Sequence, residues 1–302
     1  MTGRAGPMDD RISRRALLKQ GGLLGAALAA MGRRKGAAAA PAAPMPTIRL
    51  GDLEVSRLML GGYPFIGLGS PRWLTCRDMQ AYYTRERIVE TMGQASGCGI
   101  TGILSPRHER VLEALKAHRA AGKAMYWIAE CADKGDQAKP LLRAASQGAA
   151  ACYIHAGRVD GHVRSRDFGT LRRWLDGARK AGVPLGLGVH SPTVLAALDK
   201  VDVGQAFYVL CVYRWQDFAP EAPEKAFDPK DRQRAFEAIR EVRRPVIVCK
   251  IMAAGYHDPE EAFAYAFKRL AAKDGACVGV FTKDDRDQVS ANAGLARRLS
   301  AG

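Results

Sequence analysis

Short apolar runs alternate with longer amphipathic stretches along most of the chain, and this alternation constrains the fold more than any other feature. A short apolar run indicates a strand buried on both faces, and each run precedes a stretch of helical periodicity. Eight such strand–helix units in about 250 residues predict a (β/α)8 TIM barrel. The predicted strands are 57–62, 101–104, 125–130, 151–155, 184–189, 206–212, 245–250 and 276–281, and the predicted helices are 85–96, 107–121, 136–147, 166–181, 192–200, 230–242, 259–271 and 284–299.

The alternative to a barrel is an open, doubly wound parallel sheet. Such a sheet usually carries a G-x-G-x-x-G turn after its first strand, and the letters LGGYP at that place do not match. Residues 47–56 alternate in polarity around Gly51 and Asp52, which predicts a small hairpin capping the bottom of the barrel. Residues 63–83 are predicted to form a long loop of the kind that covers or lines a site.

The first 43 residues have the composition of an export signal. Arg14 and Arg15 precede a short apolar run, 21–31, which is followed by an alanine- and proline-rich stretch. This order resembles a twin-arginine signal peptide. The alternative is a retained membrane anchor, but the run is shorter than the roughly 20 residues that span a bilayer. We therefore expect 1–43 to be signal peptide and linker, and 47–302 to form a single barrel domain.

This signal predicts where the protein works and how it gets there. We expect the twin-arginine machinery to export the folded chain to the periplasm or another extracytoplasmic compartment, with no stable membrane span after cleavage. Residues 1–41 hold eight Lys or Arg and two Asp, so they account for six of the fifteen net positive charges. The remaining excess forms no stripe interleaved with aromatic residues. A solvated basic surface is therefore predicted rather than a nucleic-acid partner.

The seven cysteines do not follow a disulfide or zinc pattern. Their number is odd, and no C-x-x-C pair occurs. Cys152, Cys211, Cys249 and Cys277 lie in apolar runs, where a cysteine acts as a small hydrophobic residue. Neither a disulfide scaffold nor a structural zinc site is predicted.

Functional groups of a TIM barrel lie at the C-terminal ends of its strands. Glu130, His155 and His190 end adjacent predicted strands, and neighbouring strands lie about 4.8 Å apart, so these side chains can converge. They would form either a divalent metal site or a metal-free polar site of hydrogen-bonding groups. The predicted catalytic residues are Glu130, His155, His190 and Lys250, and the predicted substrate-binding residues are Tyr63, His108, Arg158 and Tyr213.

Lys250 ends an especially apolar run, PVIVC. A lysine there can act as a base, a Schiff-base former or an oxyanion clamp, because desolvation lowers the pKa of a buried ammonium. The alternative is a charge paired with Glu130 or Asp284.

Six segments together carry a resemblance to a known family: LGDLEVSRLMLGG, GITGILSPRHERVLEALK, CYIHAGRVD, KAGVPLGLGVHSPTVLAAL, IVCKIMAAGYHDPEEAFAYAFK and VFTKDDRDQVSANAGLA. They resemble segments of the aldo/keto reductase superfamily. The resemblance implies a barrel that reduces carbonyl groups with NADPH through an Asp, Tyr, Lys and His tetrad. Only the histidine matches, at His155: the aspartate position holds Leu104, the lysine position holds Cys131, and the tyrosine has no equivalent.

The same resemblance implies where NADP(H) would bind. Asn292 matches an adenine-contacting position, whereas Gln288 replaces a phosphate-binding arginine. Thr282 and Lys283 lie in the same cofactor segment. Gln205 and Cys211 are alternative equivalents of the glutamine that contacts the nicotinamide. His190-Ser191 replaces a Ser-Asn pair, and Cys249 replaces a stacking aromatic residue.

Three functions are compatible with these residues. The first is an enzyme that performs acid/base chemistry on a small carbohydrate or polyol-like substrate. In it, His155 and His190 transfer protons, Lys250 stabilises charge and Glu130 orients a partner. The second is an NADP-dependent reductase with a rearranged site, in which Tyr63 could act as the acid. The third is a barrel that binds a small molecule without catalysis.

Overall fold

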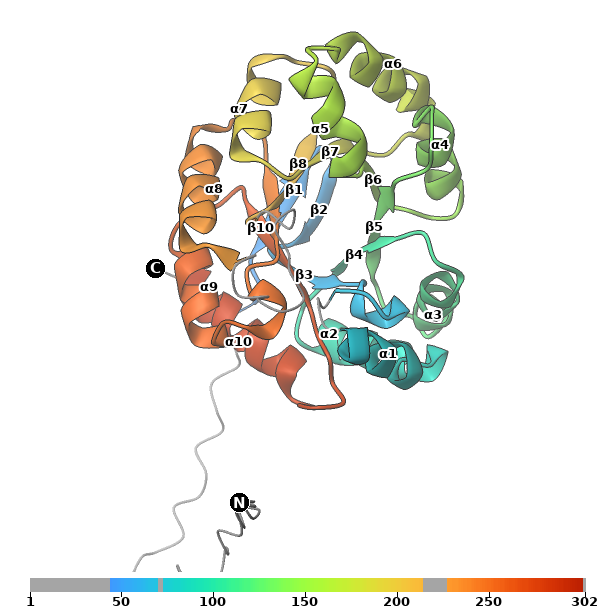
Figure 1. Ribbon diagram of the computed structural model, residues 1–302. Coiled ribbons are helices and arrows are strands. Elements are labelled where there is room, and N and C mark those ends of the chain that lie inside the picture. The colour runs from blue at the N-terminus through green and yellow to red at the C-terminus, as the bar shows by residue number, and fades with distance from the viewer. Residues whose placement is uncertain (1–43, 70–72, 214–226, 301–302) are drawn as a thin grey trace, which may run out of the picture. The chain divides into compact units, whose positions relative to one another are not determined.

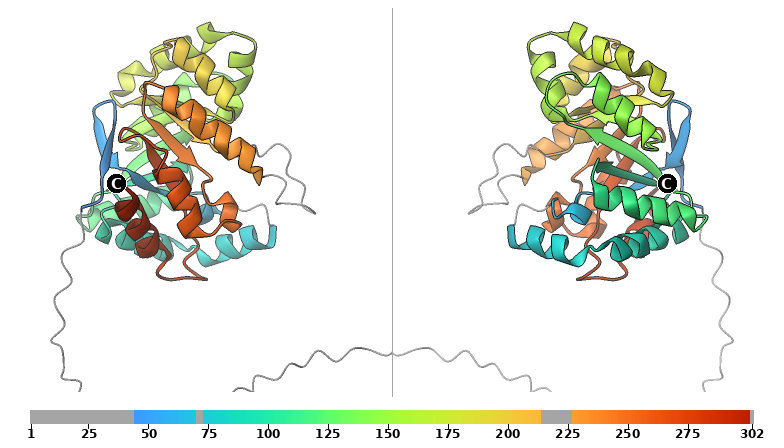
Figure 2. Two further views of the ribbon diagram at one scale, coloured as in Figure 1. Left: turned by 90° about the vertical axis from the view of Figure 1, so that its left-hand side faces the viewer. Right: turned by 90° about the vertical axis from the view of Figure 1, so that its right-hand side faces the viewer.

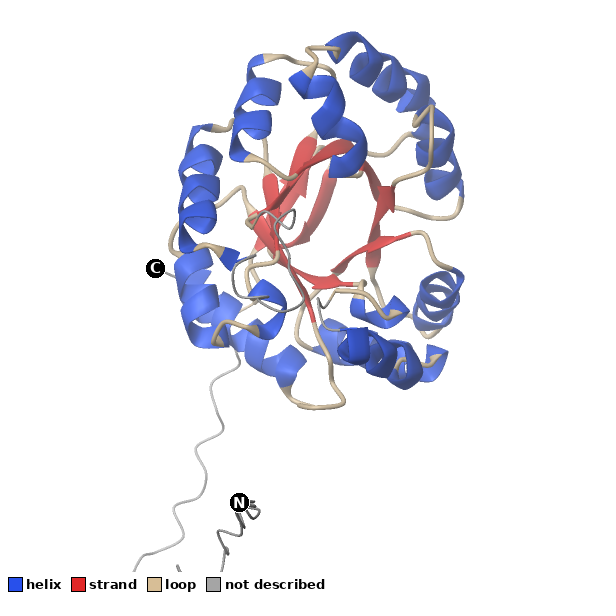
Figure 3. Cartoon of the chain, in the orientation of Figure 1, coloured by secondary structure: helices blue, strands red, loops and turns tan. Residues whose placement is uncertain are grey.

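The protein is a closed barrel of eight parallel strands surrounded by helices (Figures 1 and 3). The computed structural model describes residues 44–69, 73–213 and 227–300. The TIM barrel prediction is confirmed, and each strand lies within two residues of its predicted bounds. In barrel order the strands are β3 (Leu58–Gly61), β4 (Gly102–Pro106), β5 (Tyr126–Cys131), β6 (Ala151–Ile154), β7 (Leu185–Val189), β8 (Phe207–Cys211), β9 (Val246–Cys249) and β10 (Gly275–Gly279).

Helices cover the outside of the barrel because one face of each is apolar and packs on the strands. Their starts follow the predicted signals: Thr84 accepts a hydrogen bond from Arg87 N at 3.3 Å, and Asp258 caps the helix at Pro259. They are α2 (Arg85–Gly97), α3 (Glu109–Ala120), α4 (Ala138–Ser146), α5 (Ala156–Arg164), α6 (Phe168–Ala178), α7 (Pro192–Lys200), α8 (Pro229–Glu241), α9 (Pro259–Phe267) and α10 (Gln288–Ser300).

The predicted hairpin, strands β1 (Thr47–Leu50) and β2 (Leu53–Ser56), closes the N-terminal end of the barrel (Figure 2). Ile48, Leu50 and Val55 are buried and belong to the same apolar cluster as the inward-facing residues of the strands. This end of the barrel is therefore sealed, and a small molecule has to enter from the opposite end, where the strands terminate.

Two predicted loops contain helices. The segment 63–83 forms a 3-10 turn, η1 (Pro64–Ile66), and helix α1 (Trp73–Tyr82), because Phe65 and Tyr83 are buried and their rings lie 4.7 Å apart. The glycines after His155 indicate a loop, but that segment is α5. The imidazole of His155 caps this helix by accepting a hydrogen bond from Gly157 N at 3.1 Å.

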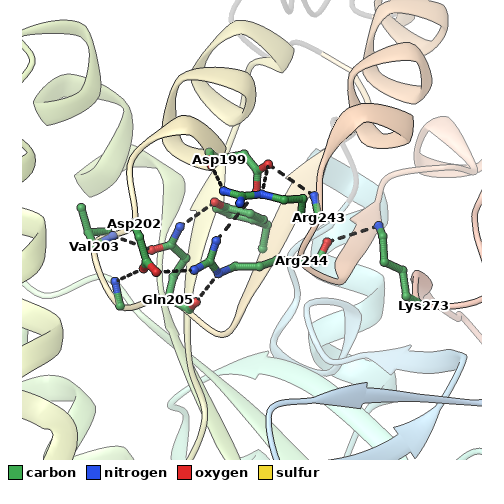
Figure 4. A network of polar contacts seen from close by, with 9 residues as sticks. Asp199, Asp202, Val203, Gln205, Arg243, Arg244 and Lys273 are labelled. Atoms are coloured by element: carbon green, nitrogen blue, oxygen red, sulfur yellow. Dashed lines mark hydrogen bonds and ion pairs between the residues drawn. The ribbon is translucent and has the colours of Figure 1, made fainter.

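A polar network joins the loops at the N-terminal end of β8 and β9 (Figure 4). Arg244 Nε donates to Gln205 O at 2.7 Å, and its guanidinium pairs with Asp202 at 2.9 Å. Gln205 Nε2 donates to Tyr208 Oη at 2.6 Å. Gln205 therefore lies at the end of the barrel opposite the mouth and cannot contact a nicotinamide there, whereas Cys211 ends β8 at the mouth.

The described residues belong to one compact unit. The predicted signal peptide lies outside the described residues. Within the described residues, no helix combines the length and apolar character needed to cross a membrane.

Candidate active site

Strands β5, β6 and β7 bring three predicted catalytic residues to the mouth of the barrel. Glu130 lies near the end of β5, and His155 and His190 follow β6 and β7 directly. The two imidazole rings are 5.4 Å apart, centroid to centroid, and meet edge to face at 76°. The charge of Glu130 acts on the pKa of His155 from close range. The predicted grouping of these three side chains is therefore present.

Two phenols hold the carboxylate of Glu130. Tyr63 donates to Oε1 at 2.5 Å, and Tyr153 donates to Oε2. Tyr153 is paired with Glu130 across strands β5 and β6, which places both side chains on the inner wall. Burial raises the pKa of Tyr63 and of Tyr153 well above the ordinary value, and the negative charge of Glu130 raises both further. Both phenols therefore stay protonated.

This arrangement cannot replace the Tyr/Lys pair of a carbonyl reductase. A tyrosine that donates a proton needs a neighbouring cation to lower its pKa. Tyr63 has a carboxylate as its neighbour instead, and that carboxylate raises the pKa. Tyr63 lies in the site as predicted, but as a hydrogen-bond donor to Glu130 rather than as an acid.

His190 forms a pair with Asp160, a residue that sequence reasoning missed. Its Nδ1 lies 3.0 Å from Asp160 Oδ2, and its backbone N–H donates to Oδ1 at 3.4 Å. Asp160 lies on α5 and is only 3% exposed. Because a carboxylate accepts this bond, we assign the ring proton to Nδ1, which leaves Nε2 as a proton acceptor. Nε2 has no hydrogen-bond partner among the described residues.

His155 has the opposite tautomer. Its Nδ1 accepts the N–H of Gly157, so the neutral ring carries its proton on Nε2. Burial lowers the pKa of His155, and the positive side chains around it add to that effect, although Glu130 opposes it. The position at the start of α5 also favours the neutral form, because the helix N-terminus is electropositive. His155 is therefore a neutral hydrogen-bond donor beside a histidine that can accept a proton.

Lys250 follows β9 in a strained turn. Its φ is 68°, and Ala253 and Ala254 have φ values of 46° and 54°. A residue other than glycine pays about 1 kcal/mol or more for this left-handed conformation, and such strain gathers at functional sites. Burial raises the pKa of the Cys211 thiol and the positive charge of Lys250 opposes that rise; the same charge lowers the pKa of His155. Lys250 thus adds positive charge to the mouth.

The predicted divalent metal site is not formed. Within the described parts of the chain, no three His, Cys, Asp or Glu side chains are arranged to hold a metal ion. The atoms that would bind the metal already have hydrogen-bond partners. Both oxygens of Glu130 accept hydrogen bonds from tyrosine hydroxyls, and Nδ1 of His190 is hydrogen-bonded to Asp160. Glu130, His155 and His190 thus lie together as hydrogen-bonding groups that protein partners already engage.

Two of the predicted substrate-binding residues have polar partners within the protein. His108 is exposed and caps α3, where its Nδ1 accepts from Arg110 N at 3.3 Å. Tyr213 is buried, and its hydroxyl lies 2.6 Å from His257 Nε2. Their role in substrate binding stays a prediction. Arg158 stays at the rim, because its Nε donates to Ala132 O after β5 at 3.2 Å.

Three of the four residues implied for NADP(H) have polar contacts within the protein, and the fourth, Asn292, is buried. Gln288 Oε1 accepts the backbone N–H of Phe281 at 2.6 Å, and Lys283 pairs with Asp78 of α1 at 3.6 Å. Thr282 is buried, and its N–H donates to Tyr83 Oη at 3.1 Å. Asn292 is 5% exposed and lines a small void among apolar side chains.

Side chains of η1 and α1 pack against the C-terminal end of β10. The rings of Tyr82 and Phe281 meet at 5.7 Å, and Pro64 of η1 lies against Gly279, so closely that a Cβ on that glycine would be 2.8 Å from the proline ring. The end of β10 is thus filled by the protein's own aromatic and proline side chains. The residues present do not fit the nicotinamide cofactor that the resemblance implies.

Acid should destabilise the folded protein through three histidines. Burial is the main cause that lowers the pKa of His118, His155 and His257. Below about pH 6.5 the unfolded chain therefore binds protons that the folded chain does not. We expect the unfolding free energy to fall as pH drops from 7 to 5. The measurement is the melting temperature across that range.

Two matched variants measure how much His118 contributes to this pH dependence of stability. His118 is 1% exposed and its Nε2 lies 2.9 Å from Ser96 Oγ, so His118→Gln should flatten the pH dependence. His108→Gln alters an exposed ring and should leave the slope unchanged. A melting temperature that rises on acidification would contradict the expectation.

No protein-family model matches the chain, and no curated protein matches its sequence. Solved structures share its fold. A candidate aldo-keto reductase from Pseudomonas aeruginosa is similar with a TM-score of 0.57 at 14% identity, covering 85% of this chain and 98% of that one. A second structure described in the same way, from the same organism, has a TM-score of 0.56 at 15% identity and covers 84% and 94%.

The barrel is also shared with an enzyme of another kind. A truncated 3-deoxy-D-arabino-heptulosonate 7-phosphate synthase from Thermotoga maritima has a TM-score of 0.50 at 16% identity, covering 85% of this chain and 92% of that one. One barrel supports many chemistries, so the likeness establishes architecture and leaves the reaction to the site. The chain has the fold of the aldo-keto reductases, an eight-stranded parallel barrel with an N-terminal capping hairpin.

Proposed function

We propose that this protein is an enzyme that moves a proton between carbon atoms of a small hydroxy-carbonyl compound of the carbohydrate or polyol class. The observation that supports this is a pair of imidazoles 5.4 Å apart with opposite tautomers. His190 offers a basic Nε2, oriented by buried Asp160, and His155 offers an Nε2–H. Proton abstraction beside a carbonyl needs these two groups: a base for the carbon and a donor for the oxygen.

The reaction can be written with this chain's own residues. His190 Nε2 takes the proton from the hydroxyl-bearing carbon next to the carbonyl. The electron pair of that C–H bond forms a carbon–carbon double bond, and the π pair of the carbonyl moves onto its oxygen. The Nε2–H of His155 bonds this oxygen, and the nearby charge of Lys250 stabilises the enediolate. His190 then gives its proton to the former carbonyl carbon, while the hydroxyl proton passes to the former carbonyl oxygen, so that the hydroxyl and the carbonyl exchange places. The result is an isomerisation that consumes no oxidant or reductant.

A neutral His155 suits this role better than a charged one. A neutral donor has a pKa closer to that of the enediol, so it stabilises the oxygen without protonating it fully. Burial lowers the pKa of His155 in the required direction. Glu130, held by Tyr63 and Tyr153, fixes the inner wall beside His155 and gives hydroxyl groups of a substrate polar partners.

The site of action belongs to the same proposal. Arg14 and Arg15 before an apolar run support export by the twin-arginine route, and a protein exported in folded form would work outside the cytoplasm. Reduced nicotinamide is regenerated by cytoplasmic metabolism, which does not operate outside the cytoplasm. An isomerase that needs no recycled cofactor therefore suits such a compartment.

Deuterium exchange tests the reaction whatever the product is. The mature protein is incubated in D2O with a panel of three- to six-carbon hydroxyaldehydes and hydroxyketones, and proton NMR follows the signal of the hydrogen next to the carbonyl. We expect at least one compound to lose this signal faster than in buffer. His155→Gln should slow the exchange by about 10²- to 10³-fold, the effect of removing one oxyanion donor.

Two results would contradict the proposal. One is an exchange rate equal to that of buffer for every compound of the panel. The other is saturable NADPH binding, seen as enhanced nicotinamide fluorescence, together with oxidation of NADPH by a carbonyl substrate. That second result would support a reductase. The control is His162→Gln, which alters a histidine that lies at the far end of α5 and pairs with Asp167 at 2.9 Å.

A further inference from the structure

Three thiols lie side by side on the inner wall of the barrel. Cys211 of β8 is paired in register with Cys249 of β9, which is paired with Cys277 of β10. Cys249 and Cys277 belong to the apolar cluster inside the barrel, and the register places Cys211 on the same wall. Cys211 and Cys249 are partly exposed, and Cys277 is 8% exposed. The row of thiols therefore begins at the mouth and continues into the barrel.

The packing of Cys249 differs from that of a cysteine used as a small apolar side chain. Cys152 shows the usual case: it is fully buried, and its thiol faces Leu141 O at 3.7 Å. Cys249 is partly exposed at the end of β9, and the register places it directly beside Cys277 on the same inner wall. Two neighbouring thiols at this end of the barrel are a candidate ligand pair.

The strand spacing suits an ion held between the two thiols. Neighbouring parallel strands are held about 4.8 Å apart by their backbone hydrogen bonds. A metal ion with metal–sulfur bonds of about 2.3 Å spans roughly 4.5 Å between two sulfur atoms, which the existing separation of the strands can accommodate.

We propose that Cys249 and Cys277 form a binding site for a soft monovalent cation, copper(I). Thiolate ligands select such ions over oxygen-loving divalent ions, and copper(I) accepts two ligands in a line. On binding, two thiols and one Cu⁺ give a bis-thiolate complex of charge −1 and release two protons. A buried anion needs a compensating charge, and Lys250, the residue after Cys249, supplies a positive charge close to its sulfur.

This inference goes beyond the proposed function and does not depend on it. The proton-transfer groups His155 and His190 lie at the ends of β6 and β7, whereas the thiols lie on β9 and β10; Lys250, directly after β9, is the residue that both proposals use. A copper ion bound between Cys249 and Cys277 would also reduce the space at this end of the barrel. Exchange activity and copper binding can therefore be measured separately on the same variants.

A chelator competition measures the site. Reduced protein is titrated without oxygen into the coloured complex of copper(I) and bicinchoninate, and loss of colour reports the copper withdrawn. We expect the wild-type protein to withdraw one equivalent. Cys249→Ser and Cys277→Ser should each weaken binding by more than about 100-fold, because even partners outside the ligand shell contribute 10- to 100-fold. Cys98→Ser, at the end of α2 and outside the barrel, is the matched control.

The pH dependence separates a two-thiol site from a single reactive thiol. Release of two protons makes the affinity rise by about 100-fold per pH unit, whereas one thiol gives about 10-fold. Cys277→Ala, with a melting curve for each variant, distinguishes a lost ligand from a lost fold. Withdrawal of no copper, a tenfold pH slope, or an equal loss in Cys98→Ser would overturn the inference.

Discussion

Replacing Asp160 with asparagine should lower the rate of deuterium exchange by about 10³- to 10⁴-fold while the protein stays folded. The carboxylate accepts Nδ1–H of His190 at 3.0 Å and holds the base with its lone pair on Nε2. An amide in that place can donate through nitrogen, which moves the ring proton to Nε2 and removes the acceptor. A wrong tautomer of this kind costs a His–Asp pair about 10⁴-fold.

The chain contains a matched control for this variant. His162 and Asp167 form a second His–Asp pair with a distance of 2.9 Å, but it is exposed and lies between α5 and α6. Asp167→Asn should leave the exchange rate unchanged. Asp160→Glu keeps a carboxylate and should recover part of the rate, a rescue that a purely structural role would not give. Equal rates for Asp160→Asn and wild type would show that His190 is not the base.

The fold was predictable because the barrel repeats one local pattern eight times. Each strand is an apolar run that ends at polar or glycine residues. An error of one or two residues at a strand end leaves the rest of the eightfold pattern unchanged. The failures have local causes. Gly157 and Gly161 suggested a loop, but Val159 and Val163 bury the inner face of α5, and packing outweighs the glycine cost. Helix α1 was missed among prolines and glycines for a similar reason.

The site was predictable only where a residue ends a strand. Glu130, His155 and His190 were found on that basis. Tyr153 was missed although it lies two residues before His155, because a tyrosine in an apolar run resembles a core residue; its register with Glu130 was the available signal. Asp160 was missed together with the helix that carries it, and only a helical prediction would have placed it near His190.

The NADP(H)-binding residues were predicted from the resemblance alone, and a sequence resemblance does not show whether a side chain is buried. Asn292, Gln288 and Thr282 match or neighbour the expected positions in sequence, yet each is engaged within the fold. The segment 63–83 accounts for this, because its turn and helix pack over β10. The C-terminal end of β10 is therefore occupied by the protein's own side chains, whereas the proposed His–Asp pair lies at the end of β7.

Replacing Asp274 with alanine should destabilise the fold by about 3–5 kcal/mol, the effect of removing one partner from a buried charged network. Asp274 is fully buried before β10. Its Oδ1 accepts from Val246 N at 2.9 Å and from Lys273 Nζ at 2.8 Å, and its Oδ2 accepts from Ala271 N at 3.2 Å. Alanine leaves two backbone N–H groups and one ammonium without this acceptor. Urea denaturation followed by fluorescence measures the loss.

Two comparisons test the explanation. Asp274→Asn keeps the shape and one acceptor, so it should lose less stability than alanine, about 1–3 kcal/mol. Glu260→Ala removes an exposed ion pair with Arg298 and should change stability by less than about 1 kcal/mol. Asp274 lies at the end of the barrel opposite the candidate site, so folded Asp274→Asn protein should exchange deuterium at the wild-type rate. A loss for Asp274→Ala no larger than that for Glu260→Ala would show that this buried carboxylate does not hold the strand ends together.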